Sequence, residues 1–185
     1  LRAFSLLDGN FKYSKKENIK FIRDNMALPF THHSRLGFVY FAQLNNLLRK
    51  DVITEAQKNS LLLSVKSIST KMKSDAYQVK LGKKSLSSFL DIYGHIRAGN
   101  YNLSSSNLKN NLEFTEMLVH NSEPQDENIS LQKVIFSNID KYFELNNIPY
   151  TASAWVEMFQ TAIATRENSK FYYTKGIDGI LNEIE

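Results

Sequence analysis

The amino-acid sequence predicts an all-α protein, an irregular helical bundle with long antiparallel helices. The 185 residues include only seven glycines and three prolines, too few for the many tight turns of a sandwich or barrel. Hydrophobic residues make up 42% and charged residues 23%, which is typical of a folded globular chain. Apolar residues also recur at the spacing of one helix face over several long stretches. We therefore expect helices along most of the chain.

The first expected helix spans residues 29–50. Pro29 suits its first turn, where a missing N–H leaves no hydrogen bond unmade. Arg49 and Lys50 suit its C-terminal end, where backbone carbonyls concentrate negative potential. The short connection at 51–53 predicts that the next helix is an antiparallel neighbour. We expect this first helix to be buried on most sides because its apolar residues leave little polar surface; they are Leu36, Phe38, Val39, Tyr40, Phe41, Leu44, Leu47 and Leu48.

The second expected helix is a single long one over residues 54–81. Thr54 and Gln57 have the spacing of a capping box, in which the hydroxyl and the amide each satisfy a backbone N–H. Gly82 is placed to end the helix. Its buried stripe is formed by Leu61, Val65, Ile68, Met72, Ala76 and Val79.

A short helix is expected at residues 85–93, capped by Ser85 and stopped at Gly94. Residues 94–112 are rich in glycine, asparagine and serine and are expected to be irregular. A solvated connector at 122–128 follows.

Two more helices complete the expected fold. Residues 129–146 form an amphipathic helix, and a last long helix begins after a proline, with Thr151 or Ser153 as its cap. Gly176 and Gly179 are expected to interrupt that helix near the C-terminus.

Charge is unevenly distributed along the chain. The net charge is +4, but residues 1–100 carry +10 and residues 101–185 carry −6. This polarity fits a basic face for a phosphorylated ligand or nucleic acid, yet docking of the two halves on each other or on acidic neighbouring domains explains it more simply. Basic residues occur singly or in pairs, which disfavours nucleic-acid binding. We expect a single helical domain over 1–185, with a basic helical half and an acidic helical half as its subdivision.

Other classes of protein are excluded by composition. The absence of cysteine excludes disulfide scaffolds, thiolate zinc sites and cysteine nucleophiles. No apolar run approaches the roughly 18 residues of a membrane span, so we expect no membrane partner and a cytoplasmic location. The N-terminus has neither a methionine nor a signal-like stretch, so we expect the chain to be a fragment of a larger protein.

No metal site is predicted from the histidines. His32 and His33 are adjacent, and neighbouring helical residues point about 100° apart, so the two rings cannot readily bind one ion. No third ligand follows at a metal-binding spacing. A structural role is therefore preferred for both.

Two basic pairs are candidate anion contacts. His95 and Arg97 lie between Gly94 and Gly99, and a glycine-flanked loop exposes backbone N–H groups beside which a histidine and an arginine could meet phosphate. The alternative is a helix stop whose polar residues tie the loop to the bundle, and we prefer it.

Arg166 and Lys170 form the second pair, at positions i and i+4 of the last helix, followed at once by aromatic residues. The pair could line a cleft for an anion, or its long side chains could simply pack over aromatic rings. The sequence favours neither alternative.

Catalytic templates are absent. The sequence has no GxxxxGK[ST] phosphate-binding loop and no GxSxG elbow. It also has no arginine followed closely by a histidine, the order expected in an all-helical ribonuclease, since Arg23 is far from His32 and Arg97 is far from His120. We assign no catalytic residue.

Three segments together resemble one family. Residues 89–103 read FLDIYGHIRAGNYNL and resemble the F-L-x-x-Y-G-H-L-R-P-G-T-Y-D-I segment of phosphoenolpyruvate-synthase-like proteins, the PEP-utilising phosphotransferases related to pyruvate, water dikinase. Residues 27–50, with PFTHHSR followed by Phe38, resemble the family's P-F-A-H-x-A-R-x-A-F-I helix. Residues 165–175, TRENSKFYYTK, resemble its R-E-x-x-K-F-x-F-T-[KR] stretch. The resemblance covers residues from about 25 to 181.

The chain also departs from the family pattern. Ala98 replaces the family's proline, Asn100 its threonine and Asn102 its aspartate. Loss of that carboxylate argues against a metal or salt-bridge role for the loop.

The resemblance implies a part without chemistry of its own. In that family an ATP-grasp domain phosphorylates a histidine on a swivelling domain, and this chain resembles the helical region between those two. It has neither an ATP-grasp pattern nor a T-G-G-x-x-S-H carrier loop, so none of its four histidines is expected to carry phosphate. ATP and Mg are implied for the parent protein, and no cofactor for this chain. Candidate phosphate or anion contacts are the residues that match family positions: His95, Arg97, Arg166, Lys170 and Arg35.

The expected function is therefore that of a non-catalytic helical linker or scaffold domain of a PEP-synthase-like, ATP-dependent phosphotransferase. Its expected partners are the ATP-grasp and phosphohistidine domains of the parent chain. The alternative is a self-contained helical interaction module for an acidic partner or nucleic acid. A third hypothesis is a binder of a small ligand between helices.

Overall fold

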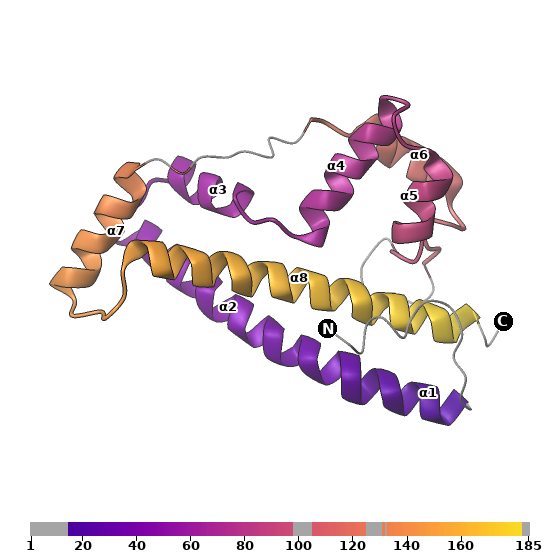
Figure 1. The fold of residues 1–185 in the computed structure, drawn as a ribbon, viewed down its shortest axis with the longest axis horizontal. Coiled ribbons are helices and arrows are strands. Elements are labelled where there is room, and N and C mark those ends of the chain that lie inside the picture. Colours follow the sequence, from indigo (N-terminus) through magenta and orange to yellow (C-terminus); the bar gives the residue numbers. More distant parts are fainter. Residues whose placement is uncertain (1–14, 98–104, 125–130, 132, 183–185) are drawn as a thin grey trace. The chain divides into compact units, whose positions relative to one another are not determined.

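The chain is all-α, as the sequence predicts. A computed structural model describes residues 15–97, 105–124, 131 and 133–182. Within these residues there is no β-strand, and one isolated antiparallel bridge joins Arg97 to Asn107. The helices (Figure 1) are α1 (Lys15–Ile22), a π-helical segment η2 (Arg23–Ala27), α2 (Leu28–Arg49), α3 (Glu55–Leu63), α4 (Ile68–Lys80), α5 (Leu86–Tyr93), α6 (Leu112–His120), α7 (Lys133–Leu145) and α8 (Ala152–Asn182).

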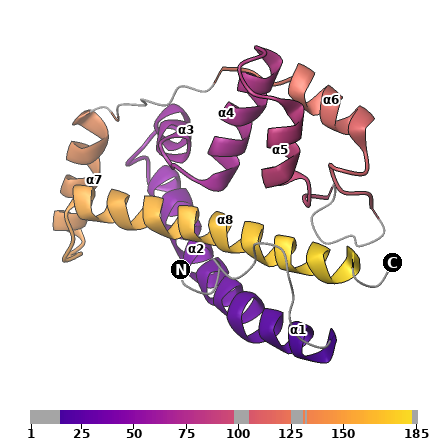
Figure 2. The same cartoon turned by 45° about the vertical axis from the view of Figure 1, so that its right-hand side comes forward.

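The chain divides into two compact units, each assembled from separate stretches of sequence. The first unit comprises Leu1–Phe30, Ile68–Gln125 and Asn168–Glu185, and the second comprises Thr31–Ser67 and Asp126–Glu167. Both units therefore draw on both the basic and the acidic half of the sequence. Within the first unit, α4, α5 and α6 group together in both views (Figures 1 and 2).

Where one helix was expected over residues 54–81, the structure has two, so that prediction is wrong. The expected start is confirmed: Thr54 and Gln57 make both hydrogen bonds of the capping box. The helix then ends because the hydroxyl of Ser64 turns back to the carbonyl of Leu61 at 2.7 Å. A new helix starts at Ile68, whose N–H donates to Oδ1 of Asn168 from a distant part of the chain.

The expected end of that region is confirmed at Gly82. Its φ is +69°, a conformation that residues with a Cβ rarely adopt. The N–H of Gly82 donates to the carbonyl of Val79, and the N–H of Lys83 donates to the carbonyl of Gln78, both at 2.9 Å. These bonds satisfy carbonyl groups in the last turn of α4.

Helix α2 begins and ends within one residue of the prediction, but the residues before it are also helical and its burial differs. The chain is already helical before Pro29, through α1 and the π-helical segment. Proline has no N–H for the preceding turn, and a widened turn accommodates it. Burial on most sides is wrong: Leu36, Phe38 and Val39 are 47%, 61% and 51% exposed. Only one side of α2 packs inward, through Gly37, Leu44 and Leu47.

Helix α8 runs without interruption, so the expected break at Gly176 and Gly179 is wrong. Gly176 is instead a packing position. A Cβ there would lie 2.6 Å from Sδ of Met26 and 3.3 Å from Cδ1 of Ile22. Tertiary packing therefore compensates for the low helix propensity of glycine. At the other end, the hydroxyl of Thr151 accepts the N–H of Ala154 at 3.2 Å, which selects Thr151 as the cap.

Each unit has its own apolar core. The core of the second unit joins α2, α3, α7 and α8 and includes Leu44, Leu61, Ile139, Trp155 and Phe159. The first unit has one cluster that includes Ala76, Phe89, Tyr93, Leu108 and Phe171, and a smaller one of Ile22, Met26 and Ile180. Among the described residues, no helix is both long and apolar enough to cross a membrane.

Candidate functional site

The loop after α5 is held against a segment that returns beside it in the first unit. The N–H of Gly94 donates to the carbonyl of Leu90 at 2.7 Å and ends the helix. Beyond it, Leu108 donates to the carbonyl of Ile96, and Lys109 to that of Gly94. A Cβ at Gly94 would collide with the carbonyl oxygen of Leu90 and would lie 3.2 Å from Cβ of Lys109, so the tight end of the helix and the returning segment both favour glycine.

His95 lies inside the first unit. Its residue exposure is 9%, its Nε2 is 3.2 Å from the carbonyl oxygen of Phe171, and the two rings meet edge to face at 4.6 Å. Burial lowers the pKa of His95 from 6.5 to about 4, although the nearby Asp178 carboxylate works against that shift. The imidazole is therefore neutral at pH 7, and it carries no positive charge for a phosphate.

Arg97 forms a buried ion pair. One guanidinium nitrogen donates to Oδ1 of Asp178 at 2.7 Å, and another donates to the carbonyl of Ser105 at 2.6 Å. The same Asp178 oxygen accepts a hydrogen bond from Nδ2 of Asn107 at 3.0 Å. The side chains of Arg97 and Asp178 are only 16% and 9% exposed. This geometry holds the loop on α8, so the expectation that the loop has no salt-bridge role is wrong: Arg97 supplies the charge that the missing family aspartate does not.

The contacts of His95 and Arg97 are those expected if the two side chains hold the loop on the helices. They join the segment at 89–97 to the later segment around Phe171, two of the three stretches in which the sequence resembles PEP-synthase-like proteins. Contact of either side chain with an anion stays a prediction. Ala98, Asn100 and Asn102, where the chain departs from the family, lie outside the described residues.

Arg166 packs on an exposed aromatic ring in the second unit. Its guanidinium carbon lies 5.2 Å from the centre of the Phe38 ring, and Nη1 donates to Oε1 of Glu167 at 2.9 Å. A Cβ at Gly37 would be 2.7 Å from Cδ of Arg166, so the glycine makes room for this stem. The packing alternative is therefore observed for Arg166, while contact with an anion stays a prediction.

The other two candidates lie in different units. Arg35 is exposed on α2 in the second unit, whereas Lys170 is partly buried on α8 in the first unit. An anion role for these two also stays a prediction.

Metal binding has no geometric basis in the described part of the chain. No group of three or more histidine, aspartate and glutamate side chains gathers there in a way that could hold an ion. His32 is exposed and His33 is partly buried on α2.

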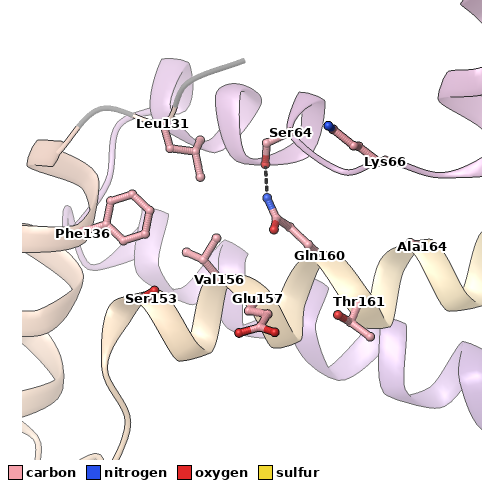
Figure 3. Close-up of a pocket in the computed structure, with 10 residues that line it drawn as sticks. All are labelled: Ser64, Lys66, Leu131, Phe136, Ser153, Val156, Glu157, Gln160, Thr161 and Ala164. Carbon is pink, nitrogen blue, oxygen red and sulfur yellow. Dashed lines mark hydrogen bonds between the residues drawn. The ribbon is translucent and has the colours of Figure 1, made fainter. Parts of the chain in front are cut away.

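A pocket that the sequence did not reveal lies within the second unit. Its volume is about 580 Å³ (Figure 3). Six of its lining residues come from one face of α8, two from the turn after α3, one from just before α7 and one from the first turn of α7: Ser153, Val156, Glu157, Gln160, Thr161, Ala164, Ser64, Lys66, Leu131 and Phe136. The available sequence signal was a face of α8 that mixes hydroxyl, amide, acidic and apolar residues. What could not be seen was the helix break at Ser64, which forms the opposite wall.

Comparisons with known proteins give no relative. No family model, no curated protein and no solved structure matches the chain.

Proposed function

We propose that the chain is a non-catalytic helical domain of a PEP-synthase-like, ATP-dependent phosphotransferase, and that it positions the ATP-grasp and phosphohistidine domains of the parent protein. ATP and Mg would bind those neighbouring domains, which also supply the chemistry. Phosphoryl transfer depends mainly on positioning and charge stabilisation, so a scaffold without a nucleophile still contributes to the rate.

One observation carries the proposal. The most distinctive residues of the family-like segments make structural contacts inside the first unit: neutral His95 contacts Phe171, and Arg97 forms an ion pair with Asp178. Residues that recur in a pattern because they hold a loop on a helix are expected in a scaffold, whereas a catalytic histidine would need access to its substrate. The cytoplasmic location belongs to the same proposal.

A phosphorylation assay tests it. The purified chain, incubated with Mg and either ATP or PEP labelled in the transferable phosphate, should incorporate no label and release no phosphate. A carrier-histidine protein of the family serves as the positive control. Incorporation of acid-labile label, abolished by replacing one of the four histidines, would overturn the proposal. The gene supplies a second test: an ATP-grasp pattern on one side of this segment and a carrier-histidine loop on the other are expected.

The alternative is an interaction module for an acidic partner or nucleic acid, and one observation favours it. The first unit carries 15 lysines and arginines against 11 acids, whereas the second carries eight of each, so all of the net +4 belongs to the first unit. Affinity for generic DNA or RNA that falls steeply with salt would support this alternative over the scaffold.

A further inference from the structure

The pocket of the second unit is built on two adjacent rows of residues on α8. Val156, Gln160 and Ala164 form one row, and Ser153, Glu157 and Thr161 form the other. Each row advances by four residues, so both run along the same side of the helix for about three turns. In Figure 3, Val156 and Gln160 point toward Leu131 and Ser64, and Glu157 and Thr161 lie on the adjacent side of the helix.

The wall of the pocket is part apolar and part hydrogen-bonding. Val156, Leu131 and Phe136 supply the apolar surface. Nε2 of Gln160 donates to Oγ of Ser64 at 2.8 Å, and that hydroxyl donates in turn to the carbonyl of Leu61. This chain of bonds orients the Gln160 side chain, so its carbonyl oxygen is the group left to accept a hydrogen bond from a ligand.

Two opposite charges flank this wall. Lys66 and Glu157 both line the pocket, and both are exposed. Neither has an ion-pair partner in the described part of the chain. One cation opposed by one carboxylate disfavours a polyanion such as a nucleotide, because the carboxylate repels phosphate. It suits a ligand that carries one charge of each sign.

We propose that this pocket binds a small zwitterion with an apolar body, of the size and chemistry of a dipeptide. The ammonium group would lie at Glu157, the carboxylate at Lys66, and the apolar side chains against Val156, Leu131 and Phe136. A volume of about 580 Å³ is in the range of small-molecule sites, which combine apolar walls with a few orienting polar groups. The proposal does not depend on the scaffold function, because it uses none of the family-like residues.

The probe is the dipeptide phenylalanyl-leucine, titrated into the full chain while backbone amide shifts are followed by NMR. Two blocked forms keep the same body: the N-acetyl form loses the ammonium charge, and the C-terminal amide loses the carboxylate charge. We expect the free dipeptide to shift amides of α8 between Ser153 and Ala164. Each blocked form should bind about two- to fivefold more weakly, the range for an exposed ion pair.

Variants assign each charge to its residue. In Glu157→Gln, N-acetylation should have no further effect, whereas amidation should still weaken binding; Lys66→Gln should show the reverse. Glu144→Gln and Lys141→Gln are matched controls, since both residues are exposed on α7 and do not line the pocket. All four variants replace exposed side chains, so each should fold as the wild type does. Their amide NMR spectra without ligand should therefore match the wild-type spectrum away from the substituted residue. The proposal is overturned if no α8 amide shifts, or if free and blocked dipeptides bind with equal affinity.

Discussion

In the first unit, hydrogen bonds and an ion pair between buried polar side chains hold the loops on the helices. The second unit has a larger core of aromatic and aliphatic side chains. In the first unit, Asp178 accepts from Arg97 and Asn107, and the hydroxyl of Tyr93 donates to Asp75 at 2.7 Å. In the second, the single tryptophan, Trp155, stacks on Phe159 with ring centres 5.6 Å apart. The first unit thus combines smaller apolar clusters with a buried ion pair, and removing one partner of that pair is costly because the other stays buried.

The largest effect is expected in the apolar core. Phe159 is fully buried, so Phe159→Ala should lower the free energy of unfolding of the second unit by about 3–5 kcal/mol. Urea unfolding followed by Trp155 fluorescence measures it, since that residue belongs to the second unit. Leu145→Ala, at a side chain 73% exposed, is the control and should change the value by less than about 0.5 kcal/mol. Equal midpoints for the two variants would contradict the assigned core.

Breaking the buried ion pair should rank second. Asp178→Asn leaves the Arg97 charge buried without its carboxylate, which should cost about 3 kcal/mol. The loss should appear in far-UV circular dichroism, which reports helices of both units, at urea concentrations where Trp155 fluorescence is unchanged. Asp24→Asn is the matched control, because its pair with Arg23 is exposed and screened by solvent, so its loss should leave the unfolding curve nearly unchanged. A similar small loss in both variants would remove the contrast between the units.

A pH effect should be confined to the first unit. Folding lowers the pKa of His95 from 6.5 to about 4, so between these values the unfolded chain binds a proton that the folded chain excludes. The stabilisation is therefore complete above pH 6.5 and is lost as the pH falls toward 4. From pH 7 to 4.5 the loss should be about 2–3 kcal/mol.

The matched variant for this test is His95→Gln, whose amide can still donate to the carbonyl of Phe171. Its unfolding free energy should fall less than that of the wild type over the same pH range. Parallel pH dependences would show that His95 is not the group responsible.

The smallest effects are expected at the helix caps. Thr54→Ala removes the capping box of α3 and should cost about 1 kcal/mol, visible in Trp155 fluorescence. Ser85→Ala removes the cap of α5 in the first unit and should cost a similar amount, visible in circular dichroism alone. Ser60→Ala, at a partly buried position inside α3, should change stability by only a few tenths of a kcal/mol, since its hydroxyl donates only to the carbonyl of Ala56 in the preceding turn of the same helix. If both cap variants shift both signals equally, the two units unfold together.

Much of the secondary structure followed from local chemistry. The caps at Thr54 and Ser85 and the stop at Gly82 depend on residues within one or two turns, and all three predictions were confirmed. Two helices were not predicted: α1, and α6, which Asn111 caps by accepting the N–H of Phe114. Both are short, and short helices are only marginally stable in isolation. Their stability in the protein comes from tertiary packing, which the sequence does not reveal.

The sequence by itself determined the all-α class, the local caps and the candidate residues His95 and Arg97. Tertiary structure decided the rest. It divided one long apolar stripe into two helices, the second of which starts where the N–H of Ile68 donates to Asn168. It also kept α8 helical through Gly176 and gave Arg97 a partner 81 residues away in Asp178. The physical reason is range: caps and periodicity involve groups a few residues apart, whereas close helix contacts, buried ion pairs and the walls of a pocket join groups that only folding brings together.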